Sequence, residues 1–374
     1  MTKSTRVRAI AAAAVVTLLM SACGSSPTAG EVEPGDGGKG TDQTSTYEGY
    51  AKLTGEARQA ELVKAAEGEG ELSIYTSWNY MDALVDVFSD KYDVNVSVYR
   101  ANSETVLQRA LQEFKAGFPG SDVFETNQME MAAASHEGLF GPYASEYRDN
   151  VREIGRFDDW TAIRYNAFMP QWNTDKVKPG EEPTSFEDMA DPKWRGRLSM
   201  EIGDSAWLQA LYYYFHDKGM SDEDFRTMFT AVAANSQVVK GHTVWSELVS
   251  AGQHDVAVSQ YLQVIHKSQE AGAHVAWKPA SGAPVQPIVM QANGMGVMKY
   301  AEHPAAATLF LDFALSDEGQ QIIESEQLLA AREPANDPLA GLELLPLDND
   351  KLLSENNVWS ERYRKLIAHE ADWW

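Results

Sequence analysis

The stretch from residue 72 to residue 125 alternates short β-strand patterns with amphipathic helix patterns, and this alternation constrains the fold strongly. Extended apolar segments at 72–75, 94–99 and 122–125 are separated by segments with helical spacing of apolar residues. The short connections between them are typical of β-α-β units, in which consecutive strands lie parallel and helices cover the sheet. We therefore expect an α/β fold.

The loops after these strands supply the first candidate binding residues. Ligands of open α/β sheets bind outside the carboxyl ends of the strands, where loops and helix N-termini converge. The second strand is followed by residues 99–103, where Ser103 is expected to cap the next helix. After the first and third strands stand Ser77, Trp78, Asn79, Thr126 and Asn127.

The first 22 residues have the order of regions found in an export signal. Basic residues come first, residues 9–20 are apolar apart from Thr17, and small residues precede Cys23, the single cysteine. The apolar run is too short for a membrane-spanning helix. Residues 18–23 resemble a bacterial lipobox, although Met20 stands where leucine is usual. We expect residues 1–22 to be a cleaved lipoprotein signal peptide, with an ordinary secretory signal and a chance cysteine as the alternative.

This N-terminus implies a location outside the cytoplasm, with a lipid on Cys23 anchoring the protein to the outer face of the cytoplasmic membrane. Residues 23–46 would then form the lipidated cysteine and a flexible tether, because the segment is rich in small and acidic residues and Val32 is its one aliphatic residue larger than alanine. The remaining length is sufficient for two domains.

Composition excludes several classes of function. The formal net charge of -24 opposes binding to nucleic-acid backbones, so we expect no nucleic-acid partner. A single cysteine and eight scattered histidines do not form a zinc or iron–sulfur motif. We therefore expect no cofactor.

Two later segments carry a family resemblance. Residues 171–177 read QWNTDKV and residues 183–197 read PTSFEDMADPKWRGR. These segments resemble the extracellular solute-binding proteins of ABC importers, in particular the ferric-ion-binding branch with the type II periplasmic-binding-protein fold, and the resemblance spans roughly residues 70–326. It implies a binding protein and not an enzyme, with two lobes that are joined by two hinge strands and close on a small solute.

The resemblance also implies the domain bounds. We expect lobe 1 at 47–168, lobe 2 at 169–282, a return to lobe 1 at 283–344, and a helical tail at 345–374. This tail is rich in tryptophan and leucine and is therefore expected to dock on the body. The expected partners of this monomer are a small-molecule solute and the permease subunits of an ABC transporter.

Lobe 2 holds two further candidate loops. Asp204 and Ser205 lie between a strand and a helix, where free backbone N–H groups and the hydroxyl would bind an anion; an ordinary N-cap is the alternative. His242 and Thr243 precede another helix and are similar to a ligand-contacting loop of the family, with a capping turn as the alternative. Trp207 is a candidate for an aromatic pocket wall.

Tyr261 decides between two kinds of ligand. Ferric-binding relatives carry two adjacent tyrosines after this strand, whereas Tyr261 is followed by Leu262. Trp78 and Asn79 stand where the family would supply a further ligand. We therefore expect a small organic or anionic solute and no bound metal, with a ferric ion or ferric complex held through Tyr261 as the alternative.

Two other classes of protein remain as alternatives. A surface hydrolase would use Asp204 and Ser205, although neither a downstream Asp-x-x-His nor a Gly-x-Ser-x-Gly motif is present. A purely structural adhesin would bind no solute.

Overall fold

The computed structural model describes residues 40–118, 120–333 and 336–374. The expected signal peptide, Cys23 and most of the expected tether lie outside these residues. Among the described residues, no helix combines the length and the apolar character that crossing a membrane requires.

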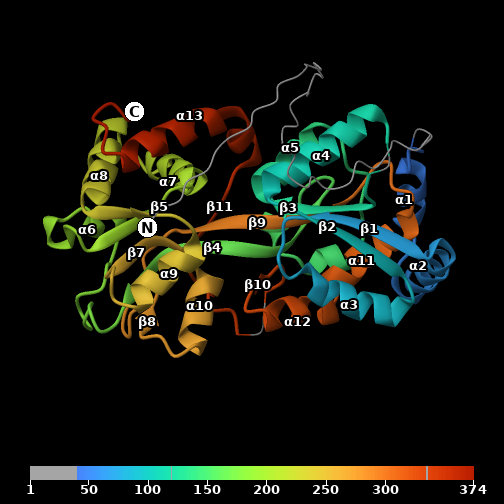
Figure 1. Ribbon diagram of the computed structural model, residues 1–374, viewed down its shortest axis with the longest axis horizontal. Helices are drawn as coiled ribbons and strands as arrows, with labels where there is room; N and C mark the ends of the chain where they lie inside the picture. The colour runs from blue at the N-terminus through green and yellow to red at the C-terminus, as the bar shows by residue number, and fades with distance from the viewer. Residues whose placement is uncertain (1–39, 119, 334–335) are drawn as a thin grey trace, which may run out of the picture. The chain divides into compact units, whose positions relative to one another are not determined.

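A mixed β-sheet organises the chain (Figure 1). Its strands follow the order β2-β1-β3-β9-β4-β7-β5-β6. The bounds are β1 (Glu71–Thr76), β2 (Asn95–Arg100), β3 (Val123–Asn127), β4 (Thr161–Asn173), β5 (Leu198–Glu201), β6 (Ser236–Val239), β7 (Val256–Tyr261) and β9 (Ile288–Val297). Three short strands, β8 (Val275–Ala276), β10 (Leu329–Ala330) and β11 (Leu344–Pro346), pair with β4 or β9.

The sheet contains two parallel groups. Strand β1 pairs in parallel with β2 and β3, which confirms the β-α-β pattern predicted from residues 72–125. Strand β5 pairs in parallel with β6 and β7. The expected α/β class is therefore confirmed.

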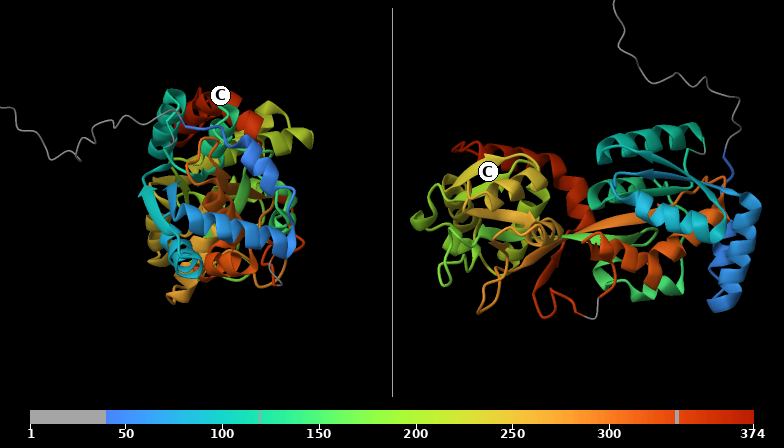
Figure 2. Two further views of the ribbon diagram at one scale, coloured as in Figure 1. Left: turned by 90° about the vertical axis from the view of Figure 1, so that its right-hand side faces the viewer. Right: turned by 60° about the horizontal axis from the view of Figure 1, so that its bottom comes forward.

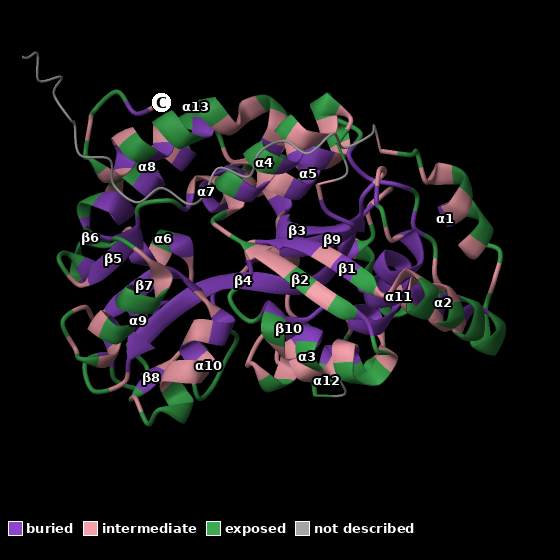
Figure 3. Cartoon of the chain, turned by 45° about the vertical axis from the view of Figure 1, so that its right-hand side comes forward, coloured by how far each residue is buried: buried purple, intermediate pink, exposed green. Residues whose placement is uncertain are grey.

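Two long strands connect these groups. Strands β4 and β9 pair antiparallel with each other, β9 pairs with β3, and β4 pairs with β7. Every residue of β4 is buried (Figure 3). Figure 2 shows β9, in orange, running between the two groups of elements. The expected lobe boundary at residue 168 falls inside β4, and the boundary at residue 282 precedes β9.

Helices cover the sheet on both faces. They are α1 (Thr44–Tyr50), α2 (Gly55–Glu69), α3 (Met81–Tyr92), α4 (Ser103–Ala116), α5 (Gln128–His136), α6 (Phe186–Met189), α7 (Ser205–Asp217), α8 (Asp222–Ala234), α9 (His242–Ser250), α10 (Leu262–Glu270), α11 (Pro304–Leu315), α12 (Asp317–Ser325) and α13 (Asn349–Ile367). Short 3-10 helices η1 (Glu146–Asn150), η2 (Glu153–Gly155) and η3 (Pro192–Trp194) lie in the connections.

Two hydrophobic clusters hold these layers together. The first surrounds α11, all of whose residues are buried. Within it the Arg58 guanidinium donates to Asp312 at 2.6 Å, and the Tyr143 hydroxyl donates to the other carboxylate oxygen at 2.7 Å. The second cluster lies between α7, α8 and α13. Because a buried carboxylate is costly without partners, the Asp312 contacts stabilise the helix pair α2 and α11.

The C-terminal helix α13 packs on α7 and α8 (Figure 1). Its buried face carries Trp359, Tyr363 and Leu366. The Tyr363 hydroxyl donates to the Glu201 carbonyl at 2.5 Å, and the Trp373 indole N–H donates to Thr230 at 2.8 Å. The tail residues thus belong to the second cluster.

Three local expectations need correction. Helix α1 begins at Thr44, inside the segment expected as tether, because Tyr47 is buried and donates to the Met298 carbonyl at 2.8 Å. The N-cap of α4 is Asn102 and not Ser103, since the Asn102 side chain accepts from the Thr105 N–H. Ser205 is the first residue of α7 and does not cap it.

Candidate functional site

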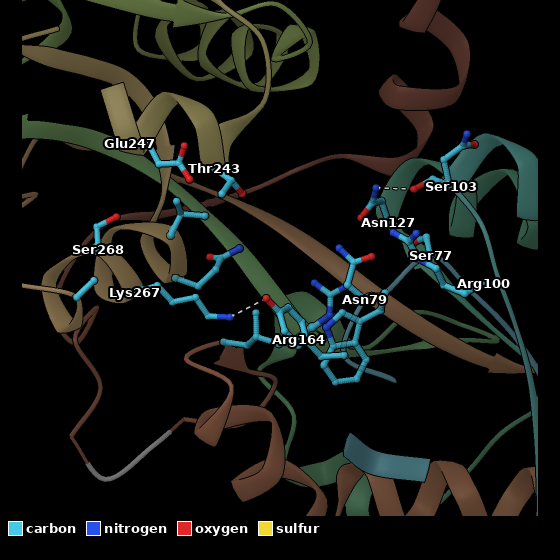
Figure 4. Close-up of a pocket in the computed structure, with 17 residues that line it drawn as sticks. Ser77, Asn79, Arg100, Ser103, Asn127, Arg164, Thr243, Glu247, Lys267 and Ser268 are labelled. Carbon is cyan, nitrogen blue, oxygen red and sulfur yellow. Dashed lines mark hydrogen bonds between the residues drawn. The ribbon is translucent and has the colours of Figure 1, made fainter. Parts of the chain in front are cut away.

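A pocket of about 640 Å³ lies between the loops that follow β1, β2 and β3 and the helices α9 and α10 (Figure 4). Its volume falls within the range of small-molecule sites, about 300–1,000 Å³. It occupies the carboxyl ends of the parallel strands, as expected for an open α/β sheet.

The structure brings five of the predicted site residues together in this pocket. Ser77, Trp78, Asn79, Asn127 and Thr243 line it. Thr126 lies beneath the wall, where its hydroxyl donates to the Ser77 hydroxyl at 3.0 Å. It therefore supports the loop after β1 and does not itself line the pocket.

The charged side chains of the pocket are mostly cationic. Arg100, Arg164 and Lys267 line it, against the single carboxylate of Glu247. Burial lowers the pKa of Arg164, and the neighbouring Glu125 carboxylate acts in the opposite direction. A guanidinium stays protonated under such shifts, so the pocket favours an anionic ligand.

Helix N-termini add to this positive character. Helices α3, α4, α5 and α9 begin at the pocket, where Tyr80, Ser103, Asn127 and Thr243 line the wall. The Asn127 amide donates to the Ser103 hydroxyl at 2.8 Å, which links the starts of α4 and α5. The N-terminus of a helix carries a partial positive charge and free N–H groups, which suit oxyanions.

One contact crosses the pocket. The Lys267 ammonium on α10 lies 3.0 Å from the Tyr80 hydroxyl and 4.1 Å from the centre of its ring (Figure 4). This hydrogen bond and cation–π contact connect the α10 side of the pocket to the loop before α3.

Asp204, His242 and Tyr261 form a separate network outside the pocket lining. Asp204 lies 3.2 Å from His242 Nε2 and accepts from the Ser259 hydroxyl at 2.6 Å. His242 Nδ1 lies 3.1 Å from the Gln260 side-chain oxygen, and the His242 ring stacks on Tyr261 with centroids 3.7 Å apart. Burial would lower the pKa of His242, but the Asp204 carboxylate raises it overall.

The Tyr261 side chain is packed between the rings of His242 and Phe168. Burial raises the pKa of its hydroxyl well above the ordinary value, and Asp204 raises it further. An edge-to-face contact with Phe168 holds its ring. Tyr261 therefore lies outside the pocket lining and packs beside His242.

Glu201 joins Asp204 and His242 in a group whose ligand atoms lie within 4.8 Å of one another, which is compatible with a metal ion. The Glu201 carboxylate accepts from the backbone N–H groups of Gly203 and Gly241, the latter at 2.8 Å. Because these side chains already have hydrogen-bond partners, the group holds the starts of α7 and α9 together.

The remaining two predicted residues lie elsewhere. Trp207 is buried in the second cluster, where its ring packs against Phe186 and Phe229. It does not form a pocket wall, because its position on α7 faces the core. The Ser205 hydroxyl lies 3.4 Å from that of Ser360, which supplies no general base for a serine nucleophile.

The sequence interpretation missed four charged residues of the pocket. Arg100 is the last residue of β2 and lies in the predicted loop 99–103. Arg164 is the one charged residue between residues 160 and 172. A lone arginine in an apolar strand was a usable signal. Glu247 and Lys267 carried none, since their helices reach the pocket only through tertiary packing.

The comparisons with known proteins agree with this arrangement. The family profile described as bacterial extracellular solute-binding protein matches residues 119–355. The chain belongs to this family. The members are binding proteins and not enzymes, which confirms the prediction of a binding protein over a hydrolase.

Individual relatives and solved structures are similar to this chain over most of its length. The chain is 26% identical over 281 residues to iron uptake protein A2 of Synechocystis sp., covering 70% of this chain and 78% of that protein. The structure of iron-bound HitA from Pseudomonas aeruginosa aligns with a TM-score of 0.64 at 21% identity, covering 78% of this chain and 99% of that one. The periplasmic binding protein AfuA from Actinobacillus pleuropneumoniae, with exogenous fructose-6-phosphate bound, aligns with a TM-score of 0.60 at 22% identity, covering 81% and 98%. The predicted two-lobed type II periplasmic-binding-protein fold is confirmed, and the solute-binding protein serves ABC transport outside the cytoplasm.

Proposed function

We propose that this solute-binding protein takes up iron as an anionic ferric complex and delivers it to the permease of an ABC importer. The observation that carries this proposal is the pocket itself, in which Arg100, Arg164 and Lys267 face a single carboxylate. Such a surface suits the anionic ligands of a metal complex better than a bare cation.

The oxygen ligands of the pocket support the same choice. Hard Fe(III) prefers carboxylate and phenolate oxygens. Among the lining residues, Glu247 offers a carboxylate and Tyr80 a phenol, while Tyr261 lies outside the lining. A ferric ion would therefore bring most of its coordination with it, and the volume of about 640 Å³ leaves room for small anionic ligands.

Iron is favoured by the names of the relatives, an iron uptake protein and an iron-bound binding protein. A sugar phosphate is the second candidate, because AfuA has fructose-6-phosphate bound in a similar fold. Its phosphate would suit the helix N-termini of the pocket. Either solute would bridge both lobes and favour the closed state.

Calorimetric titration of the protein tests this proposal. Ferric citrate should bind at least about tenfold more tightly than citrate alone, a difference of about 1.4 kcal/mol. Fructose, which is neutral, should show no binding under the same conditions. Preference for fructose-6-phosphate over ferric citrate would replace the first candidate by the second, and absence of binding by every anion would contradict both.

We also infer that the protein acts as a monomer held at the membrane through a lipid on Cys23, after removal of residues 1–22. The order of basic, apolar and small residues before that cysteine supports this inference. In the native host, Cys23→Ser should move the protein from the membrane fraction to the soluble fraction. Unchanged fractionation would contradict lipid anchoring.

A further inference from the structure

Two hydrogen-bond donors in the pocket wall are buried and unpartnered among the described residues. They are the indole N–H of Trp78 and the Nε–H of Arg164. The two side chains are 4% and 6% exposed, and both line the pocket. A buried donor without an acceptor is costly, and such groups in native proteins have a reason.

The Arg164 guanidinium is held firmly from two sides. One of its amino groups donates to the Glu125 carboxylate at 3.1 Å, and its centre lies 5.1 Å from the Trp78 ring. Glu125 is fully buried and accepts a further bond from the Thr76 hydroxyl at 2.5 Å. These contacts fix the guanidinium of Arg164, which lies on β4, beside the indole of Trp78.

We propose that Trp78 and Arg164 select the solute by donating hydrogen bonds to one of its anionic oxygens. Glu125 is a positioning residue, which holds Arg164 and does not touch the solute. An indole is a donor only, and a guanidinium matches the geometry of carboxylate and phosphate oxygens. The solute class is therefore one that presents a carboxylate or phosphate, and this inference rests on the proposed function.

Binding of two anionic probes to the full chain tests this assignment. Ferric citrate and fructose-6-phosphate are titrated into the wild type, Trp78→Phe, Arg164→Lys and the control Lys64→Gln, which removes an exposed charge on α2. Trp78→Phe keeps the ring beside Arg164 and should weaken binding about tenfold, as expected for loss of one hydrogen bond to a charged group. Arg164→Lys keeps the charge and should weaken binding by at least as much, whereas Lys64→Gln should change affinity less than twofold.

A second set of variants separates positioning from folding. Arg164→Gln alone leaves the Glu125 carboxylate buried without its cation, which destabilises the fold. The double variant Glu125→Gln with Arg164→Gln removes both charges and so tests the loss of the Arg164 donor separately from this destabilisation. The thermal midpoint of each variant is measured to check that it is folded. Glu125→Gln alone should weaken anion binding severalfold. A simple charge effect would do the opposite, because the substitution removes a negative charge near the pocket.

The outcomes distinguish this inference from the proposed function. Weaker binding of ferric citrate by folded Trp78→Phe supports a carboxylate at this position, and weaker binding of fructose-6-phosphate supports a phosphate. If the wild type binds a probe and folded Trp78→Phe binds it equally well, the assignment is overturned while the proposed function stands. If the wild type binds neither probe, both fail.

Discussion

Tyr261 is the residue whose predicted role depended most on its surroundings. In the sequence, the resemblance to ferric-binding proteins makes Tyr261 a candidate iron ligand. In the structure its ring lies between His242 and Phe168, and burial raises the pKa of its hydroxyl. Such packing depends on residues far apart in the sequence, since Phe168 lies 93 positions before Tyr261, and sequence spacing does not reveal it.

Tyr261→Phe should therefore leave ferric citrate affinity within about threefold of the wild type. The reason is that a phenol outside the pocket lining makes no bond to the complex. Calorimetry measures the affinity, and absorption spectroscopy looks for a tyrosinate–iron charge-transfer band. A band in the wild type that disappears in Tyr261→Phe would mean direct coordination and contradict this view.

His303 and Asp122 form a pH-dependent pair at the start of α11. The ring Nδ1 lies 3.0 Å from the Asp122 carboxylate. The hydrogen bond to Asp122 raises the pKa of His303 above its ordinary 6.5. Burial alone would raise the pKa of Asp122, but its bonds to His303 and to backbone N–H groups lower it below 3.8.

These shifts have opposite consequences for stability. A raised histidine pKa stabilises the fold below pH 6.5, and this contribution is lost as the pH rises through the folded-state value. A lowered aspartate pKa contributes above pH 3.8 and is lost in acid. The pair is therefore most stabilising near pH 5.

Denaturant unfolding of His303→Gln tests this pair. The difference in free energy of unfolding between wild type and variant should be largest near pH 5 and should shrink by roughly 1 kcal/mol by pH 9. His136→Gln, at an exposed position on α5, serves as the control. Equal differences at pH 5 and pH 9 would refute the assignment.

At the scale of elements, the sequence predicted the three strands of the first β-α-β units. The segments 72–75, 94–99 and 122–125 correspond to β1, β2 and β3, which pair in one parallel group as the pattern predicted. The ends were less predictable. Asn102 caps α4 in place of Ser103 because the backbone turns one residue earlier, a choice that neither side chain dictates.

Helix α13 gives a matched pair of variants on one element. Trp359 is buried, and its indole N–H donates to Glu355 at 2.9 Å, whereas the adjacent Val358 is 51% exposed. Trp359→Ala should lower the free energy of unfolding by about 3–5 kcal/mol through loss of packing. Val358→Ala should change it by about 0.5 kcal/mol or less. Equal effects of the two substitutions would mean that α13 does not dock as described.

At the scale of the whole molecule, the pocket is made by parts of the chain far apart in sequence. Ser77, Trp78, Asn79, Asn127 and Thr243 could be anticipated, since loops after parallel strands converge. Glu247 and Lys267 could not, because their place depends on how α9 and α10 face the loops of β1 and β2. The sequence predicted a small organic or anionic solute without these two arginines. Arg100 and Arg164, which belong to the sheet itself, favour the anionic solute.

The central claim is that the protein carries its cargo as an anion held in this pocket. Native mass spectrometry of protein purified from its own host, followed by denaturation to release the ligand, tests it most directly. We predict a bound mass equal to ferric ion together with its own carboxylate or phosphate ligands. A bound mass equal to ferric ion alone, or to a neutral or cationic solute, would contradict the account.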